Sequence, residues 1–429
     1  MGRVLPFVGL RYDPARVGDV NDVVAPPYDV IPADQAARYF NRSPYNIARI
    51  ELARLLYPEA QDPYRLAAAE LGRWQREGVL RPDPAPGFYV YALAFNWGGR
   101  RFDRVGLVGM VRLPEAADGS VLAHERTVPP TVADRLELLR ATRTNTSPLF
   151  GLVLDDGSAL QAELAALGSA LQPVAEAADE AGSHRLGRLT DPAALRRLTG
   201  LLAGAQVLVA DGHHRFRAAQ LFRDENRRDL RERPRAAWNY VLMVLYPAAD
   251  PSLVILPTHR LIPDGPGPGQ VFRRLEAHFE VRPFGGTARE LAAELEASDR
   301  PAFGLYGPGG LYLLTLRRLP EPGSGWPEDR PGAWRQVDVG LAQVLIVEQA
   351  FGVDDPGRLG YTRELAEAVG QVEAGRYGWA VILRPPRAEE VVALARAGVE
   401  MPPKSTYFYP KPLSGLVLAP LDQELREAL

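Results

Sequence analysis

The chain has 429 residues and a formal net charge of −3, with 50 basic and 53 acidic residues. This length suffices for two or three domains, and the balanced charge does not favour binding to nucleic acid. The absence of cysteine excludes disulfides, thiolate metal sites and cysteine nucleophiles. No apolar run of about 18 residues occurs and no apolar leader opens the chain, so we expect a cytoplasmic protein without membrane partners.

Turn-rich motifs and short elements are predicted for the first part of the chain. Pro26 and Pro27 exclude a central strand and indicate a rigid corner. Apolar spacing then predicts regular elements. In chain order these are a strand over 47–52, a helix over 63–77, and a hairpin with strands over 88–96 and 102–111.

A polar cluster, His124-Glu125-Arg126-Thr127, precedes a predicted helix over 132–143 that carries Arg135. The next apolar run, 149–154, predicts a strand. An alanine-rich stretch near 155–195 then predicts helices inserted before the following strand.

Residues 207–219 contain the densest group of polar side chains after a buried strand. The β-branched run 207–210 breaks at Asp211-Gly212, and a helix begins with His213, His214 and Arg215. The free N–H groups and positive dipole of a helix N-terminus favour an anion, and Gly212 permits close approach. An Asp-Gly turn is also common in α/β proteins, and a histidine near a helix start is often only a cap. The density of polar groups favours a functional site.

The C-terminal part is predicted to be an α+β domain, with helices on one face of a sheet. A strand over 240–245 and the block Pro257-Thr258-His259-Arg260 precede a Pro/Gly run, 264–269, which predicts a domain boundary. The loop 401–411 contains Lys404 and three aromatic residues, and both a structural and a functional role are open. The expected helices are 271–278, 288–296, 339–350, 362–374 and 388–397, and the expected strands 303–306, 311–317 and 379–383.

Seven motifs occur along the chain in order: Pro6-Phe-x-Gly-Leu-Arg-Tyr, Val24-Ala-Pro-Pro-Tyr-Asp-Val-Ile, Arg42-Ser-Pro-Tyr-Asn, His124-Glu-Arg-Thr, Ala210-Asp-Gly-His-His-Arg, Leu256-Pro-Thr-His-Arg and Met401-Pro-Pro-Lys-Ser-Thr-Tyr-Phe-Tyr-Pro-Lys. Together they closely resemble the bacterial domain-of-unknown-function family numbered 1015, over essentially the full chain. This resemblance implies no activity.

A more distant resemblance does imply one. The His124–Thr127 cluster before the Arg135 helix, and the turn Asp211–Arg215, are similar to motifs of free-serine kinases with a ParB/sulfiredoxin-like fold. This similarity implies an α/β to α+β chain, with a catalytic region over 1–263 that includes the insertion near 155–195, and an α+β domain over 270–429. It also implies a small-molecule kinase that acts on L-serine or O-phosphoserine.

Phosphoryl transfer requires an anion cradle, a charge clamp and a carboxylate that orients or deprotonates the acceptor. Glu125 or Asp211 is the candidate base, and we expect the two to lie within one substrate's width of each other. The other carboxylate, with Asp211 as the candidate, is expected to hold Mg²⁺. ATP, ADP and pyrophosphate stay open as donors, as does the oligomeric state. The candidate phosphate-binding residues are Gly212, His213, His214, Arg215, Arg126 and Arg135, and further candidates are His124, Thr127, His259, Arg260 and Lys404.

Two alternatives belong to other classes. A ParB-like nucleotide-binding or DNA-associated module would be expected to have a separate helix-turn-helix domain and a basic surface, and neither is visible. A metal-dependent phosphohydrolase would use His124, His213, His214 and Asp211 as ligands. Adjacent histidines rarely point at one metal from a helix, which disfavours this second alternative.

Overall fold

The computed structural model describes residues 3–115, 118–154, 158–230, 233–263, 265–323 and 325–426. These residues form two compact units. Unit 1 comprises 1–123, 127–253 and 410–429, and unit 2 comprises 124–126 and 254–409. The division after Leu253 precedes the Pro/Gly run at which the sequence predicts a boundary, and the last 20 residues of the chain return to unit 1.

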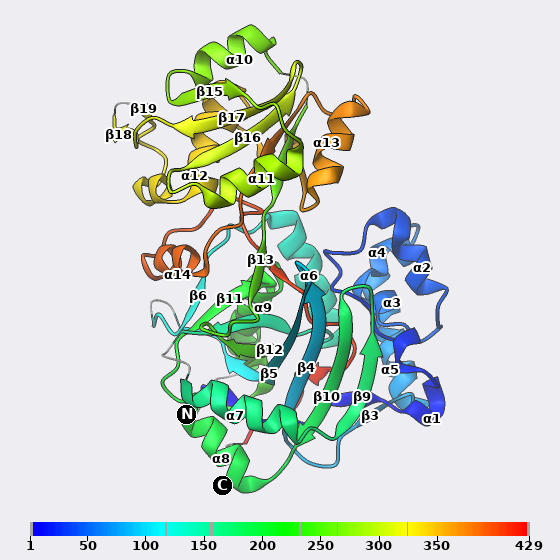
Figure 1. Cartoon of the computed structure of the whole chain (residues 1–429). Coiled ribbons are helices and arrows are strands. Elements are labelled where there is room, and N and C mark those ends of the chain that lie inside the picture. Colours follow the sequence, from blue (N-terminus) through cyan, green and yellow to red (C-terminus); the bar gives the residue numbers. More distant parts are fainter. Residues whose placement is uncertain are drawn as a thin grey trace. The chain divides into compact units, whose positions relative to one another are not determined.

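Unit 1 is built on a large mixed sheet (Figure 1). Strands β6 and β11 pair in parallel, as do β8 and β12, and the other pairs are antiparallel. In spatial order the strands are β6 (Val121–Ala123), β11 (Val207–Asp211), β8 (Leu149–Val153), β12 (Tyr240–Pro247), β5 (Arg100–Arg112), β4 (Phe88–Trp97), β10 (Gly182–Leu189) and β9 (Pro173–Ala178), and β1 (Val4–Leu5) pairs with β5.

Helices α6 and α9 of unit 1 pack against each other, and α9 contacts β11 and β12. The N-terminal helices are drawn in blue in Figure 1. Their apolar side chains form a hydrophobic cluster around the buried Trp74. Two short strand pairs complete the unit: β2 (Leu10–Tyr12) with β3 (Leu80–Pro82), and β7 (Thr144–Asn145) with β23 (Ala419–Pro420). The helices are α1 (Pro14–Val17), α2 (Ala36–Phe40), α3 (Ala48–Glu51), α4 (Ala53–Leu56), α5 (Pro63–Arg76), α6 (Pro129–Thr142), α7 (Ser158–Ser169), α8 (Pro192–Leu201) and α9 (His213–Leu230).

Unit 2 contains an antiparallel six-stranded sheet. Its strands in spatial order are β15 (Phe279–Pro283), β17 (Gly310–Leu316), β16 (Ala302–Gly307), β21 (Trp379–Ile382), β14 (His259–Ile262) and β20 (Gly360–Thr362), and β13 (Val254–Leu256) pairs separately with β22 (Tyr407–Tyr409), as β18 (Glu321–Pro322) does with β19 (Gly325–Trp326). The helical segments are α10 (Pro268–Leu275), α11 (Ala288–Ala297), α12 (Asp338–Leu341), a π-helix over Ala342–Ala350, α13 (Leu365–Glu373) and α14 (Ala388–Arg396).

The unit 2 helices cover both faces of this sheet, so the prediction of a single covered face is wrong. Leu313 packs with the α11 and α13 side chains, whereas the ring of its neighbour Tyr312 contacts the ring of Phe272 of α10. Successive side chains of a strand point to opposite faces. Helix α10 therefore lies opposite α11 and α13, where Trp379 also contacts Phe272.

Most elements predicted from the sequence are confirmed, and two in unit 1 are not. Within the predicted strand 47–52, residues 48–51 form the helix α3 and not a strand. The Asn46 side chain accepts a hydrogen bond from the Ala48 N–H group, and Ala48, Ile50 and Glu51 are buried. The stretch near 155–195 is not wholly helical. Its described part places the antiparallel pair β9 and β10 between α7 and α8, and β10 extends the main sheet through β4.

No helix among the described residues is both long enough and apolar enough to span a membrane.

Candidate active site

The turn between β11 and α9 has the geometry that the sequence predicts. Asp211 is the last residue of β11 and follows an irregularity in the pairing with β8. Gly212 has φ +94°, and a Cβ atom there would lie 3.0 Å from both Leu149 and the Arg215 guanidinium. The positive φ therefore favours glycine at this position, and any other side chain would also be a tight fit. Helix α9 begins at His213, so its first N–H groups have no acceptor within the helix.

The Asp211 carboxylate is held by two cations. The Lys411 ammonium lies 2.5 Å from Oδ1, and Nη2 of Arg215 lies 3.2 Å from Oδ2. Lys411 is also 2.5 Å from an oxygen of Asp29, and its side chain is 5% exposed. A buried lysine thus joins two carboxylates at the start of α9.

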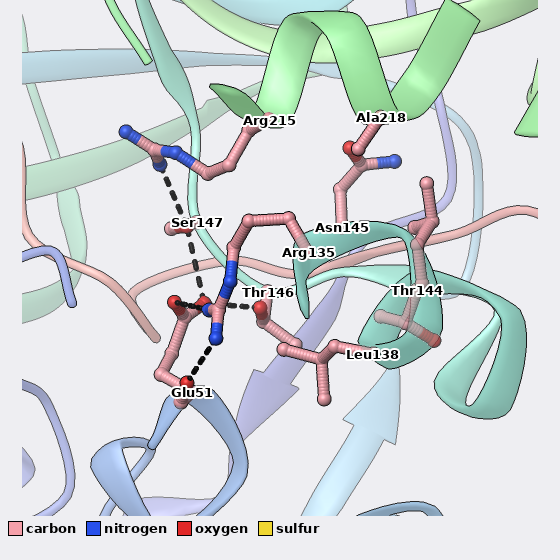
Figure 2. A pocket seen from close by; sticks show the side chains of 10 residues that line it. Glu51, Arg135, Leu138, Thr144, Asn145, Thr146, Ser147, Arg215 and Ala218 are labelled. Atoms are coloured by element: carbon pink, nitrogen blue, oxygen red, sulfur yellow. Dashed lines mark hydrogen bonds and ion pairs between the residues drawn. The ribbon is translucent and has the colours of Figure 1, made fainter. Parts of the chain in front are cut away.

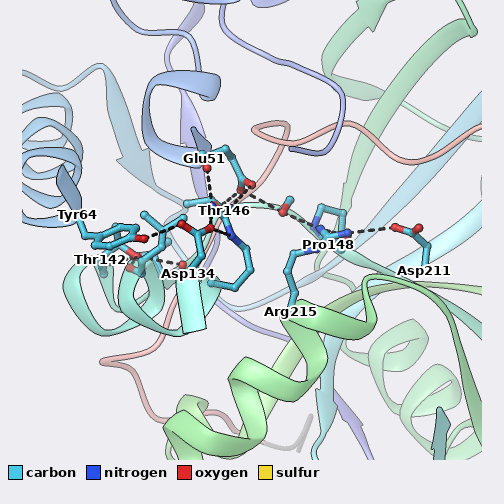
Figure 3. Close-up of polar contacts among 12 residues, drawn as sticks. Glu51, Tyr64, Asp134, Thr142, Thr146, Pro148, Asp211 and Arg215 are labelled. Carbon is cyan, nitrogen blue, oxygen red and sulfur yellow. Dashed lines mark hydrogen bonds and ion pairs between the residues drawn. The ribbon is translucent and has the colours of Figure 1, made fainter. Parts of the chain in front are cut away.

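Arg215 extends this contact into a longer polar network, which Figure 3 shows. Its Nη1 donates to the Ser147 hydroxyl at 2.7 Å and to the Pro148 carbonyl at 3.0 Å. Ser147 in turn donates to Glu51 at 3.1 Å, and Thr146 donates to the same carboxylate oxygen. The network connects the N-terminus of α9 to the end of α3.

Arg135 belongs to this network and is buried. It pairs with the Glu51 carboxylate at 3.4 Å and donates to the Glu51 main-chain oxygen at 2.9 Å (Figure 2). It also donates to the Asp134 carboxylate. Its guanidinium also lies 4.0 Å from the centre of the Tyr28 ring. Burial by itself lowers the pKa of Arg135, but Glu51 and Asp134 reverse the effect and the net shift is upward. Burial likewise raises the pKa of Tyr28, and Asp29 adds to that shift.

Arg135 and Arg215 line a cavity of about 40 Å³, together with Glu51, Asn145 and Ser147 (Figure 2). Such a volume accommodates water molecules but not a nucleotide. Arg135 therefore occupies an internal position, where it holds Glu51. A role in phosphate binding for Arg135 stays a prediction.

The two histidines of the α9 turn lie in unit 1. His213 is 7% exposed, whereas His214 is half-buried. The His214 Nε2 atom accepts a hydrogen bond from the Val128 main chain at 3.0 Å, so this side chain connects α9 to the segment that follows Thr127. Thr127 is itself half-buried.

The residues His124, Glu125 and Arg126 belong to unit 2. His124 is fully buried, and its Nε2 lies 2.8 Å from the Thr406 hydroxyl. Glu125 forms a parallel bridge with Met401, and the exposed Arg126 lies 3.6 Å from Glu400. The polar cluster is therefore joined to the loop 401–411.

Three further candidates also lie in unit 2. His259 accepts a hydrogen bond from the Leu383 main chain at 3.2 Å, and burial, aided by Arg260, lowers its pKa to about 4. Burial lowers the pKa of Arg260 to about 10, against the attraction of Tyr361 and Glu125. Lys404 is exposed and has φ +57°.

The described residues contain no group of three or more His, Asp or Glu side chains arranged to hold a metal ion. The phosphohydrolase alternative requires such a group. Two of the three histidines it would use are engaged elsewhere: His124 with Thr406 and His214 with Val128.

The structure joins Asp211, Arg215 and Arg135 in one network, and it adds partners that the sequence reasoning missed. Lys411 and Asp29 each lie within one of the seven quoted motifs, and this position is the sequence signal that could have indicated a role at the site. Glu51 and Ser147 lie outside these motifs. Their role depends on contacts between residues far apart in sequence, which local patterns do not predict. The expected proximity of Glu125 and Asp211 stays a prediction.

A family model described as "Protein of unknown function (DUF1015)" matches residues 4–340. The chain belongs to this family. No curated protein matches this DUF1015 chain.

Several solved structures are similar to this DUF1015 chain at low identity. A conserved hypothetical protein from Pyrococcus furiosus is 17% identical, with TM-score 0.35, over 74% of this chain and 93% of that one. A free serine kinase in complex with AMP is 13% identical, with TM-score 0.36, over 74% of this chain and 90% of the kinase chain. C-terminally truncated SbnI from Staphylococcus aureus is 10% identical, with TM-score 0.37, over 73% and 87%.

Proposed function

We propose that this chain is a small-molecule phosphotransferase that interconverts L-serine and O-phosphoserine. We assign the chemistry to a ParB/sulfiredoxin-like catalytic region within residues 1–263, followed by an α+β domain. The observation that carries the proposal is the position of Asp211, which lies at the start of α9 between the Lys411 ammonium and the Arg215 guanidinium. The motif resemblance to free-serine kinases supplies the acceptor.

The groups around Asp211 match what phosphoryl transfer requires of a protein. The N-terminus of α9 places the positive end of the helix dipole at this turn, which favours an anion. Lys411 and Arg215 supply positive charge beside it, held in place by Asp29 and Ser147. Charges that are oriented before the reaction stabilise developing negative charge without reorganisation.

Asp211 and Asp29 are the residues that would hold Mg²⁺. The Lys411 ammonium lies 2.5 Å from one oxygen of each carboxylate and fills the point between them, so Mg²⁺ would bind beside this lysine at their remaining lone pairs. Mg²⁺ binds through one or two carboxylates together with substrate phosphates. When bound, Mg²⁺ would neutralise charge on the donor phosphates. ATP, ADP and pyrophosphate are the proposed donors.

Glu125 is proposed as the general base, and its proximity to Asp211 is part of the proposal. The serine hydroxyl oxygen forms a bond to the terminal phosphorus of the donor, whose bridging P–O bond breaks. The hydroxyl proton passes to the Glu125 carboxylate, and the shortened donor leaves with the electron pair. Both oxygens of Asp211 already contact cations, so Asp211 is suited to binding and orientation and not to accepting the proton.

The test is phosphorus NMR of the full chain with L-serine, Mg²⁺ and each donor in turn. We expect O-phosphoserine from at least one donor, and the reverse reaction from O-phosphoserine and the spent donor. Formation of inorganic phosphate without phosphoserine would favour hydrolysis. An absence of phosphoserine with all three donors would contradict the proposal.

A further inference from the structure

A second, larger cavity lies wholly within unit 2. Its volume is about 400 Å³, and its lining includes Arg260, Thr258, Ser405, Asp338 and Arg384. Small-molecule sites commonly have volumes of about 300–1,000 Å³. This cavity is therefore large enough for a metabolite.

Arg260 is the buried cation of this cavity. It lies on β14, is 1% exposed, and donates through Nη1 to the Thr258 main-chain oxygen. Its Nε and Nη2 atoms have no hydrogen-bond partner within the described part of the chain. These two N–H groups lie along one edge of the planar guanidinium, and a carboxylate accepts two parallel hydrogen bonds from such an edge.

The surroundings leave the charge of Arg260 largely uncompensated. Tyr361 and Glu125 attract it, yet burial is the larger effect and lowers its pKa to about 10. The adjacent His259 is neutral near pH 7, since its pKa is lowered to about 4. Unbonded buried donors are costly, so an oxyanion bound at this edge would relieve an existing penalty.

The other charged residues of the lining restrict the ligand. Glu296 and Asp299 line the cavity as exposed carboxylates. With one buried cation that has two unbonded donors, and with two carboxylates, the cavity disfavours a polyanion and favours a ligand that carries both signs of charge. The remaining charged side chains form two internal pairs, Arg384 with Asp338 and Arg387 with Glu390.

We propose that this cavity binds the zwitterionic head group of a free α-amino acid. The ligand carboxylate accepts from Nε and Nη2 of Arg260, and the ligand ammonium faces Glu296 and Asp299. The proposal concerns unit 2 alone, and it does not rest on the phosphotransferase activity proposed for Asp211.

The test is titration calorimetry of the full chain with the common α-amino acids, one at a time. Acetate, methylammonium and inorganic phosphate serve as probes of each charge separately. We expect at least one amino acid to bind more tightly than all three probes. Arg260→Gln is expected to weaken that binding at least about tenfold, because a two-donor contact to a charged group is lost. The exposed Arg289→Gln on α11 is the matched control and should bind as the wild type does.

A further variant separates this site from the proposed active site. Asp211→Asn is expected to lose phosphoserine formation and to retain amino-acid binding at Arg260. If Arg260→Gln does not fold, Arg260→Lys takes its place, because it keeps the charge and loses the two-donor edge. Failure of every amino acid to bind, equal or tighter binding of acetate or phosphate, or full binding by the Arg260 variant would each overturn the proposal.

Discussion

Two of the buried arginines, Arg135 in unit 1 and Arg260 in unit 2, differ in what surrounds them. Arg135 in unit 1 contacts Glu51 and Asp134, and its pKa is raised. Arg260 in unit 2 has two donors without partners in the described part of the chain, and its pKa is lowered to about 10. A buried arginine that contacts carboxylates, such as Arg135, holds those carboxylates in position. A buried arginine without such contacts, such as Arg260, lowers the stability of the protein and is expected where a ligand supplies the missing partner.

The largest expected effect is that of replacing Arg135, the arginine whose charge is paired. Arg135→Met should lower the free energy of unfolding by about 3–5 kcal/mol, because the buried Glu51 carboxylate would lose its cation and the half-buried Asp134 would lose the nearer of its two arginines. Denaturant unfolding measures the change. The control Arg140→Met removes an exposed arginine from the same helix and should cost about 1 kcal/mol or less. Equal costs for the two variants would show that the network is not a stabilising feature.

His259 gives unit 2 a defined pH dependence. Its folded-state pKa of about 4 lies below the ordinary 6.5, so the unfolded chain takes up the proton first. Stability from this group is present above pH 6.5 and is lost as pH falls toward 4, by about 3 kcal/mol in total. His259→Asn keeps an acceptor for the Leu383 main chain and should flatten this part of the unfolding profile. An unchanged profile would mean that His259 titrates normally.

Glu125→Gln sharpens the assignment of the general base. We expect turnover to fall by about 10² or more with little change in KM, because general base catalysis is typically worth that much. The melting temperature should stay near that of the wild type. The exposed Glu373→Gln in the same unit is the control and should be fully active. A fully active or unfolded Glu125→Gln would make Glu125 structural.

The smallest expected effect is that of replacing Arg260, the arginine with two unbonded donors. Arg260→Met should leave the free energy of unfolding without ligand unchanged or slightly higher, because it removes a buried charge whose burial penalty exceeds the attraction of Tyr361 and Glu125. Denaturant unfolding beside Arg135→Met gives the contrast. A loss as large as that of Arg135→Met would show that Arg260 has a structural partner.

Local signals in the sequence predicted much of the fold. The alternation in 88–111 predicted the β4–β5 hairpin, and Asp211-Gly212 predicted the strand, turn and helix that position the candidate site. The prediction of a strand over 47–52 is wrong because a short buried helix and a buried strand have similar composition. Local spacing carries no information about tertiary pairing. For that reason the contacts of Lys411 with Asp211 and of Glu51 with Arg135, which join distant parts of the chain, were not predicted.

The most direct test of the central claim compares phosphoserine formation by Asp211→Asn and Asp224→Asn. Both substitutions change an aspartate to its amide, and Asp224 lies on α9 with its side chain 47% exposed. With the donor that supports wild-type activity, we predict a loss of turnover of about 10² or more for Asp211→Asn, because the group that orients the phosphate-binding cations is neutralised. Asp224→Asn should retain wild-type turnover. Equal activity of the two variants, with phosphoserine formed at the wild-type rate, would contradict the assignment of the reaction to the start of α9.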